Sequence, residues 1–501
     1  MIRHRSLRSL VHSVAFACFS MGFNTGIIAG GLLYLDAHFI EIQENPVLKG
    51  AVTASVFFSA FLANIFVAAL ADCCGRLFLL RFMNVPFLLG AMVVATASTP
   101  SLIIVGRFIT GFAVGIAGTL PNLYIAEIVS PESRGRFVGM APLYGTFGIM
   151  IAQFFSLLVA AVVGHEACCA FGWRIMFGAG AVPAVVQAVW TARIPESPRW
   201  CSQRGHTERA IECRDYIANL AGGAGIQDTQ GSEAAEQLSL HNAAIAVGLS
   251  VMQQLSGVNA VIFYAPHIYA QLGVRDTLAI LVAGCNSVAQ VAMTRVMTKI
   301  VDSWGRRPIC FFGLIGMLIG LVMLGEVFEQ AFTELPVGFA VVGILIFRLS
   351  FSLSLGPLPY IMVTELFPQR QRAQGAALSM MTNWFLNWGV VFMVPELMRQ
   401  FQGAVFFAFA GVCAISMVVV DLGLPETAGR DLGDTSSFGS RMSKSYLMRA
   451  CLFVVHLFRR KRATEAASLL RERRQADATA AEAGDLPCSS FTSVEGQRRQ
   501  T

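Results

Sequence analysis

Charged residues form three short patterns in this chain, and each pattern occurs twice. Arginine offers a planar fork of donors to a carboxylate, and glycine allows neighbouring backbones to approach closely. The patterns therefore predict ion pairs at helix corners, in a latch that breaks when the molecule changes conformation. The alternative is that these charges only set the topology of the chain. The copies are Asp72-x-x-Gly75-Arg76 and Asp302-x-x-Gly305-Arg306-Arg307, Glu127 with Arg134 and Glu365 with Arg372, and Pro195-Glu196-Ser197-Pro198-Arg199 and Pro425-Glu426-Thr427-Ala428-Gly429-Arg430.

The segments between these patterns are too apolar for a water-soluble domain. Of the 501 residues, 55% are hydrophobic and 14% are charged, whereas soluble domains contain about 25% charged residues. Apolar runs long enough to cross about 30 Å of hydrocarbon recur along the chain. Inside a bilayer, backbone polar groups need internal partners, which leaves helices or closed barrels. Strand-like alternation is absent, so the chain is predicted to be an all-α membrane protein.

Twelve apolar segments are expected to form transmembrane helices in two six-helix halves. The predicted domains are the first half (1–194), a linker with short helices (195–241), the second half (242–430) and a largely disordered tail (431–501). Two similar halves that face one another would form a substrate cavity at their interface. The segments lie near 11–35, 50–71, 78–99, 101–124, 137–163, 173–194, 242–270, 277–299, 308–328, 336–362, 373–397 and 403–424.

The distribution of arginine predicts the orientation, because cytoplasmic loops are enriched in Lys and Arg. The loops with the duplicated patterns hold Arg76, Arg134, Arg306 and Arg372, and the loops on the other side are poor in positive charge. We therefore expect both termini, the linker and all the duplicated patterns on the cytoplasmic side.

Charge and missing motifs exclude several function classes. The net charge is +6, and the tail contains an apolar stretch (446–458) followed by Arg459-Arg460-Lys461-Arg462. We expect this tail to contact anionic lipid rather than nucleic acid. The sequence lacks the P-loop, the His-Glu-x-x-His zinc motif and a nucleophile elbow, and its 12 cysteines include no Cys-x-x-Cys pair. We predict that the chain is not an enzyme and has no cofactor or metal site.

Taken together, the motifs resemble those of the sugar porters of the major facilitator superfamily, a family that includes facilitative hexose carriers and polyol transporters. The resemblance implies a carrier that works by alternating access. Opposite charges from the two halves should then meet in the outward-open state, close the inner mouth, and part in the inward-open state. The resemblance covers residues 14–430 and rests on Gly106-Arg107-Phe108, Glu127 with Arg134-Gly135-Arg136, the Pro195 and Pro425 motifs, Gln253-Gln254-Leu255-Ser256-Gly257-Val258-Asn259, and Asp302 to Arg307.

The resemblance also suggests which residues bind the substrate. Gln253, Gln254 and Asn259 match the family's polar cluster in the seventh segment. Their amides combine donors and acceptors, which suits sugar hydroxyls. Amides are costly in lipid unless they face a wet cavity or find partners, so hydrogen bonding between helices is the alternative. Asn286, Asn383 and Trp384 match further ligand positions.

Other positions depart from the family pattern. Asn24 stands where proton-coupled relatives carry Asp; because an amide takes up no proton at physiological pH, this coupling site is missing. Pro142 replaces a ligand glutamine, so we expect one lost polar contact and a kinked helix. Tyr360 replaces a tryptophan and retains an aromatic wall for a sugar. Arg348, near the outer end of the tenth segment, is expected either to snorkel to external headgroups or to line the cavity mouth.

We therefore predict a carrier for a monosaccharide or polyol, with facilitative uniport as the favoured mechanism. Two alternatives stay open. One is a proton symporter whose proton site lies elsewhere, for instance at Glu127 or at groups linked to Arg107. The other is a sugar sensor that binds but barely transports. The plasma membrane is favoured over an internal membrane as the location.

Overall fold

The computed structural model of the chain describes residues 6–129, 137–192, 194–220, 239–329, 336–367 and 371–425, which all belong to one unit, Met1–Phe438. Every regular element in these ranges is a helix. Twelve helical segments among them are long and apolar enough to cross a membrane, which confirms the predicted number. The predicted tail, including the 446–458 stretch, lies outside the described residues.

Three of the first six spans, α1, α3 and α6, begin at helix ends that a side chain caps. The Ser6 side chain accepts a hydrogen bond from the backbone N–H of Ser9, and Asn45 caps the next span, which has Pro46 in its first turn. Such caps satisfy backbone donors that lack a partner inside the helix. The spans are α1 (Leu7–His38), α3 (Pro46–Cys74), α4 with α5 (Arg76–Phe82, Asn84–Ala95), α6 (Pro100–Ile128), α8 (Met140–Val163), and the run α9, η2, α10 and α11 (His165–Ala167, Cys168–Gly172, Trp173–Gly178, Ala181–Thr191), with α2 (Ile40–Glu44) between α1 and α3.

Two short helices and six further spans follow. In the linker, Ser197 caps α12 and Pro198 occupies its first turn. The linker helices are α12 (Pro198–Gln203) and α13 (Thr207–Leu220). The spans are α14 with α15 (Leu240–Leu255, Val258–Gln271), α16 (Asp276–Trp304), α17 (Arg306–Phe328), α18 with α19 (Pro336–Leu353, Leu358–Leu366), α20 (Arg372–Phe401) and α21 (Ala404–Gly423).

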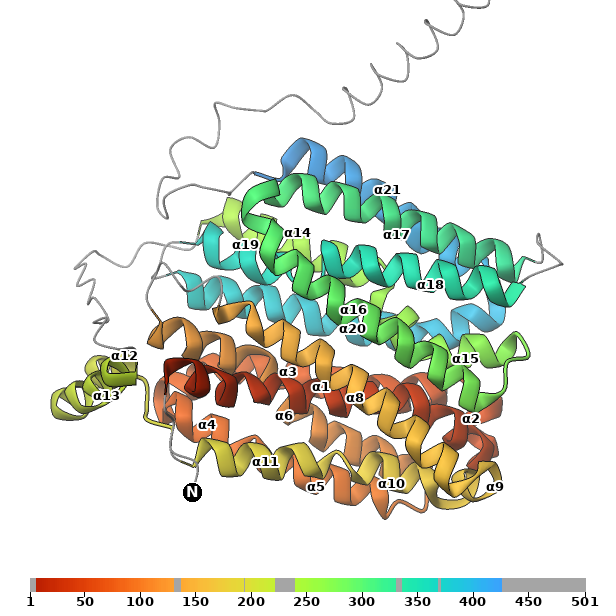
Figure 1. Ribbon diagram of the computed structural model, residues 1–501, viewed down its shortest axis with the longest axis horizontal. Coiled ribbons are helices and arrows are strands. Elements are labelled where there is room, and N and C mark those ends of the chain that lie inside the picture. Colours follow the sequence, from red (N-terminus) through yellow and green to blue (C-terminus); the bar gives the residue numbers. More distant parts are fainter. Residues whose placement is uncertain are drawn as a thin grey trace, which may run out of the picture. The chain divides into compact units, whose positions relative to one another are not determined.

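The spans lie side by side, with the first half in red to yellow and the second in green to blue (Figure 1). Helix α1 packs on α8, α3 on α6, and α17 on α18 and α21 within their halves, while α3 contacts α20 and α8 contacts α16 across the two halves. We call the end of the bundle at which α3 and α16 finish, next to Gly75 and Gly305, the motif end. The interface between the halves therefore runs along α3–α20 and α8–α16.

Several spans are interrupted, and these interruptions shape the interior. The seventh span breaks at Ser256 and Gly257, and the tenth breaks between Leu353 and Leu358. Pro142 acts as predicted in part: α8 starts at Met140, after a turn at Gly139. Pro142 therefore sits in the first turn of α8, where its missing N–H leaves the Val138 carbonyl without its helical donor. The chain breaks before this proline instead of kinking within α8.

Candidate functional site

The break in the seventh span depends on Gly257. Its φ of +77° is a left-handed conformation that glycine adopts without strain. A Cβ at this position would also lie 2.5 Å from the ring of Phe409. The break separates Gln253 and Gln254 at the end of α14 from Asn259 in the first turn of α15. Polar side chains are thus concentrated where the regular helix is interrupted inside an apolar span.

These amides form one continuous hydrogen-bonded network with Asn383 of α20. Asn259 Nδ2 donates to Gln254 Oε1 at 2.8 Å, and Gln254 Nε2 donates to Asn383 Oδ1 at 2.9 Å. Asn383 Nδ2 in turn donates to Gln253 Oε1. A buried network that is satisfied in this way has a single defined arrangement. The predicted residues of α14, α15 and α20 are therefore brought together.

The network ends on the broken tenth span. Gln253 Nε2 donates to the carbonyl oxygens of Leu355 (2.6 Å) and Gly356 (3.1 Å). The Leu355 carbonyl is available because its helical donor would come from Pro359, which has no N–H. Pro359 thus leaves an acceptor free inside the bundle. The break between α18 and α19 therefore supplies hydrogen-bond acceptors to Gln253 of α14.

A cavity of about 330 Å³ lies against this network, between α3 and α6 of the first half and α14, α19 and α20 of the second. Gln253, Tyr360 and Asn383 line it from one side, and Asn64 and Asn122 line it from the other. Its size falls at the lower end of the range for small-molecule sites, about 300–1,000 Å³. The lining continues to Arg199 and Gln203, two exposed residues of the linker, so the cavity opens at the motif end.

Trp384 of α20 packs against α3 and α6 of the first half, at the interface between the halves. Its ring stacks on Phe57 of α3, with centroids 6.1 Å apart and an angle of 12° between the planes. A Cβ on Gly118 of α6 would lie 2.8 Å from the indole, so this glycine leaves the room that the ring occupies. The indole Nε1 is buried and has no hydrogen-bond partner. Trp384 is therefore placed at the interface with a free donor.

Asn286 is not part of this network. Its Nδ2 donates to the Tyr269 hydroxyl at 2.8 Å, and it does not contribute to the lining of the cavity. The next residue, Ser287, donates to Gln153 Oε1 of α8 in the other half. In this conformation Asn286 thus stabilises the packing of α15 on α16, close to the second contact line between the halves.

Both expectations for Arg348 are wrong. The side chain is fully buried and lies outside the cavity lining. It donates to Gln290 Oε1 at 2.7 and 3.0 Å, to Ser287 Oγ at 2.8 Å and to the Ala283 carbonyl at 3.2 Å. Neutral acceptors on α16 satisfy the guanidinium inside the bundle, so it reaches neither headgroups nor the cavity mouth. The sequence shows that a positive charge lies in this segment but does not show which groups bind the Arg348 guanidinium.

Asn24, at the predicted position of a missing proton site, is held by backbone carbonyls. Its Nδ2 donates to Ser20 O at 2.9 Å and to Gly180 O at 3.2 Å. Arg107 is also buried; it donates to the Thr53 carbonyl at 3.3 Å and lies over the Phe177 ring. Within the described ranges, Arg107 has no ion pair with a carboxylate. This part of the first half therefore contains a buried cation and an amide.

The first copy of the charged patterns forms a compact cluster. Arg76 pairs with Glu127 of α6 at 3.1 Å and with Asp72 at 3.0 Å. Gly75 has φ +97°, and a Cβ there would lie 2.7 Å from Glu196 Oε2. Glu196 accepts from the backbone N–H groups of Arg76 and Leu77 at the start of α4, both at 3.1 Å, which satisfies free donors of that helix. Burial raises the pKa of Glu196 above its ordinary value.

The second copy repeats the design. Gly305 has φ +87°, and Arg306 pairs with Glu365 of α19 through contacts of 2.6 and 3.2 Å. Arg307 donates to the backbone and side chain of Asp421. In this copy too, the ion pairs join spans of the same half. These pairs tie the start of α17 to α19 and α21.

The predicted contacts between the two halves at the motif end remain a prediction. The pairs described above, Arg76–Glu127 and Arg306–Glu365, each lie within one half. Arg134 lies outside the described residues, as do the side chains of Asp302 and Arg372. An open cavity at this end agrees with a state in which the two sets of charges are apart.

The halves approach one another at the end opposite the motif end. A Cβ on Gly50 of α3 would lie 2.2 Å from the carbonyl oxygen of Phe392 in α20. His165 of the first half lies 3.0 Å from Asp276 of the second. Nearer the middle of the bundle, Phe57 stacks on Phe263 at 5.4 Å. The cavity at the amide network thus opens at the motif end. A separate cavity of about 840 Å³ lies at the opposite end, between α2 and α3 of the first half and α15 and α20 of the second.

The sequence matches the family described as sugar (and other) transporter over residues 10–437. The chain belongs to the sugar transporter family. It is therefore an integral multi-pass membrane transporter and not an enzyme, as predicted. The relatives of this transporter include plastidic glucose transporter 4 of Arabidopsis thaliana, with 31% identity over 85% of this chain and 80% of the relative. They also include the major myo-inositol transporter IolT of Bacillus subtilis, with 28% identity over 85% of this chain and 93% of the relative.

The fold of the transporter is that of solved major facilitator structures. The xylose transporter XylE from E. coli, in a partially occluded inward open conformation, superposes with a TM-score of 0.75 and 24% identity, covering 85% of this chain and all of XylE (100%). This confirms the predicted fold class.

Two further amides in the transporter were not predicted as ligands. Asn122 of α6 lines the cavity and has a buried Oδ1 without a hydrogen-bond partner. Asn387 is one turn from Asn383 on α20, and its buried Oδ1 also lacks a partner. The available signal was an amide inside an apolar span. Both atoms are hydrogen-bond acceptors, and only Asn122 of the two lines the cavity.

Proposed function

We propose that the cavity binds a monosaccharide or polyol and that the transporter moves it by alternating access as a uniporter. The observation that supports this most is the amide network of Gln253, Gln254, Asn259 and Asn383 beside a cavity that opens at the motif end. Amides that combine donors and acceptors suit the hydroxyls of a sugar. The names of the glucose and myo-inositol relatives agree with this class of substrate.

Uniport is favoured by the residues around Asn24. A coupled carrier needs a group in the transport path that takes up and releases a proton, and Asn24 is an amide bound to two carbonyl oxygens. Transport then depends only on the sugar gradient. Because the motif end is predicted to be cytoplasmic, the described conformation corresponds to the inward-open state.

Proton symport is a second candidate because of Glu127. This carboxylate lines the cavity, and its Oε2 is buried without a hydrogen-bond partner. Glu127→Gln separates the two candidates. Under symport the variant loses concentrative uptake but retains exchange of sugar across the membrane. Under uniport neither the wild type nor the variant concentrates sugar.

The substrate can be identified with the purified full chain in proteoliposomes. Counterflow of radiolabelled hexoses, pentoses and inositols is measured, and binding of the same compounds is measured in detergent. We expect at least one of them to exchange, and Asn383→Ala to weaken both binding and exchange. Asn84→Ala is the matched control, because Asn84 is a buried amide whose Nδ2 donates to the Leu80 and Arg81 carbonyls of its own span. Binding without any exchange would overturn the proposal and favour a sensor.

The location is proposed to be the plasma membrane. A tagged full-length chain should co-localise with a plasma-membrane marker. Co-localisation with an internal membrane would contradict this, and the plastidic relative makes organelle membranes the first alternative to examine.

A further inference from the structure

One face of α16 is exposed along the whole helix. The exposed residues recur every three or four positions, which is the spacing of a single helical face. From the start of the helix to its middle this face is apolar, as expected for contact with lipid tails. The opposite side of the helix carries buried polar residues such as Asn286 and Gln290. The exposed residues are Thr277, Leu278, Leu281, Cys285, Val288, Ala292, Arg295, Val296, Lys299, Ser303 and Trp304.

Two cations interrupt this apolar face. Arg295 and Lys299 lie one turn apart, both exposed, and both fall inside the part of α16 that is apolar enough to span a membrane, Asp276–Val301. In the described part of the chain neither side chain has an ion pair or a hydrogen bond to a side chain. The sequence contains no acidic residue between Leu278 and Ile300. The positive charge on this face is therefore uncompensated by the helix itself.

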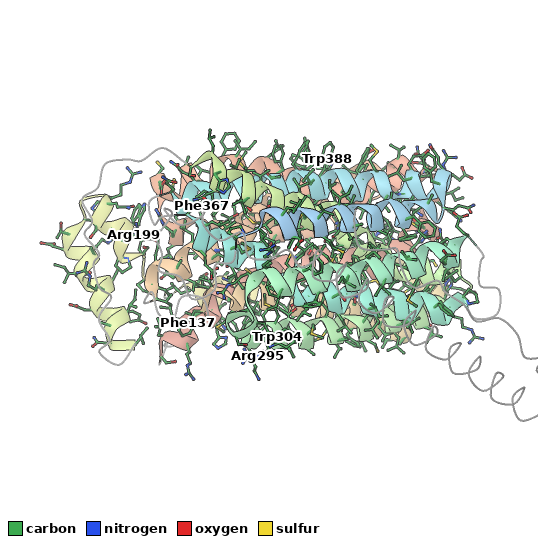
Figure 2. All side chains as sticks on the ribbon, turned by 90° about the horizontal axis from the view of Figure 1, so that it is seen from above. Phe137, Arg199, Arg295, Trp304, Phe367 and Trp388 are labelled. Carbon is green, nitrogen blue, oxygen red and sulfur yellow. The ribbon has the colours of Figure 1, made fainter. Side chains whose placement is uncertain are left out.

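The position of the cations along the helix places them near a headgroup layer. Arg295 precedes Gly305 by ten residues, which corresponds to about 15 Å at 1.5 Å per residue, and Lys299 is about 9 Å from Gly305. Long basic side chains at such depths extend to the interface. Trp304, which is 62% exposed, has the position typical of an aromatic residue in the interfacial belt. Figure 2 shows Arg295 and Trp304 on the outer side of the bundle, pointing away from it.

We propose that Arg295 and Lys299 bind the headgroup of an anionic phospholipid in the leaflet at the motif end. An isolated charge within the hydrocarbon layer is costly, and the phosphate and net negative charge of such a lipid supply the missing counter-charge. The motif end is predicted to be cytoplasmic, where anionic lipids are concentrated. A zwitterionic lipid would leave the two cations without net compensation.

The proposed lipid site lies on the same helix as residues that contact the other half and the motif end. The same helix carries Ser287, which contacts Gln153 of the other half, and it ends at Gly305, immediately before the Arg306–Glu365 pair. A lipid held on the outer face of α16 would therefore stabilise the folded carrier by mass action, as any ligand of the native state does.

The test uses purified full-length protein in a neutral detergent with added phosphatidylglycerol or phosphatidylcholine. Bound lipid is counted by native mass spectrometry, and thermal unfolding is followed in parallel. We expect phosphatidylglycerol to be retained preferentially and to raise the unfolding temperature. The double variant R295Q/K299Q should bind it about 25-fold more weakly, since a basic residue near an anionic surface corresponds to about fivefold in affinity.

Controls distinguish the site from other causes. Arg275→Gln, an exposed cation at the other end of α16, should leave the preference unchanged, and R295K/K299R should retain it because both charges remain. Soluble glycerol phosphate at millimolar concentration should not replace the lipid. The proposal is overturned if R295Q/K299Q retains the full preference, or if glycerol phosphate produces the same stabilisation. It is also overturned if the exposed face instead mediates dimers that the double variant disrupts without a change in lipid binding.

Discussion

Replacing Glu365 by glutamine should shift the carrier toward its inward-open state. In the described conformation Glu365 is bound to Arg306 of its own half, while the cavity is open at the motif end. In the outward-open state we expect charges of the two halves to meet there. A substitution changes the balance between states only through contacts that differ between them. If the Arg306–Glu365 pair is present in both states, losing it changes the free energy of both equally and does not shift their ratio. The ratio then changes only through the contact that Glu365 makes with the other half in the outward-open state.

The magnitude follows from the kind of contact that is lost. A hydrogen bond to a charged group contributes about 1.5–3 kcal/mol, and about 1.4 kcal/mol is a factor of ten in an equilibrium constant. Glutamine keeps the size of Glu365 and removes its charge, so the ratio of inward-open to outward-open carrier should rise by at least about tenfold. For a tenfold change in this ratio, the inward-open population rises nearly tenfold if it is a minor state of the wild type and about twofold if the two states are equally populated. It rises by less than twofold if the wild type already favours the inward-open state.

The assay is the rate of maleimide labelling of a thiol in the cavity. Ala377 lines the cavity, so Ala377→Cys is introduced into a background in which the exposed Cys73, Cys74 and Cys285 are replaced by serine. Glu365→Gln should accelerate labelling and slow net transport. Glu396→Gln is the control, because Glu396 pairs with Arg399 of the same helix, three residues away. An unchanged labelling rate in a well-expressed Glu365→Gln variant would show that these charges only set topology.

Three further predictions test the site, the coupling and the motif end. Gln254→Ala and Asn259→Ala should each weaken substrate binding several-fold, because a neutral hydrogen bond contributes about 0.5–1.5 kcal/mol; normal transport of every substrate by both folded variants would make the network structural only. Uptake should be nearly independent of external pH between about 5.5 and 7.5, since Asn24 does not titrate; a steep rise toward acid pH, measured in proteoliposomes, would contradict this. Burial raises the pKa of Glu196, so its contribution to stability is present at low pH and is lost as pH rises through the raised pKa. Between about pH 4.5 and about pH 7, the unfolding temperature of the wild type should therefore fall more than that of Glu196→Gln. Equal changes of unfolding temperature with pH in the two proteins would refute the raised pKa of Glu196.

The fold followed from the sequence because the relevant signals are long and repeated. Twelve apolar runs, broken by polar loops, leave helices as the structure that satisfies the backbone in lipid. The span limits were less accurate: α16 continues to Trp304, beyond the predicted 299, because a helix can extend into the headgroup layer after its apolar part ends. The break in α14–α15 was visible only as Gly257 in a polar cluster.

The site was predicted less completely because hydrogen-bond partners depend on three-dimensional packing. The family resemblance indicated Gln253, Gln254 and Asn259 as one polar cluster and Asn383 as a separate ligand position, and the structure joins all four in one network. The sequence did not indicate that the carbonyl of Leu355 would complete that network. This carbonyl is free because the residue four positions later, Pro359, has no N–H to donate. Arg348 was assigned to the membrane boundary by its position alone, whereas neutral groups of α16 bind it in the interior.

The same limit applies to the charged patterns. Their duplication predicted ion pairs at helix corners, and Arg76 with Glu127 and Arg306 with Glu365 form such pairs. The periodicity of the chain does not reveal whether a pair lies within a half or between halves, since both arrangements bring the same motifs to the same end. The contact that changes between states has to be measured.

The steady-state sugar ratio across the membrane of proteoliposomes, under an imposed inward proton gradient, tests the proposed uniport most directly. The purified full chain is supplied with a substrate identified by counterflow, and internal and external sugar are measured until they stop changing. We predict equal concentrations on both sides, reached at the same rate with or without a protonophore. A higher internal concentration that collapses when the protonophore is added would contradict uniport and assign proton coupling to a group other than Asn24.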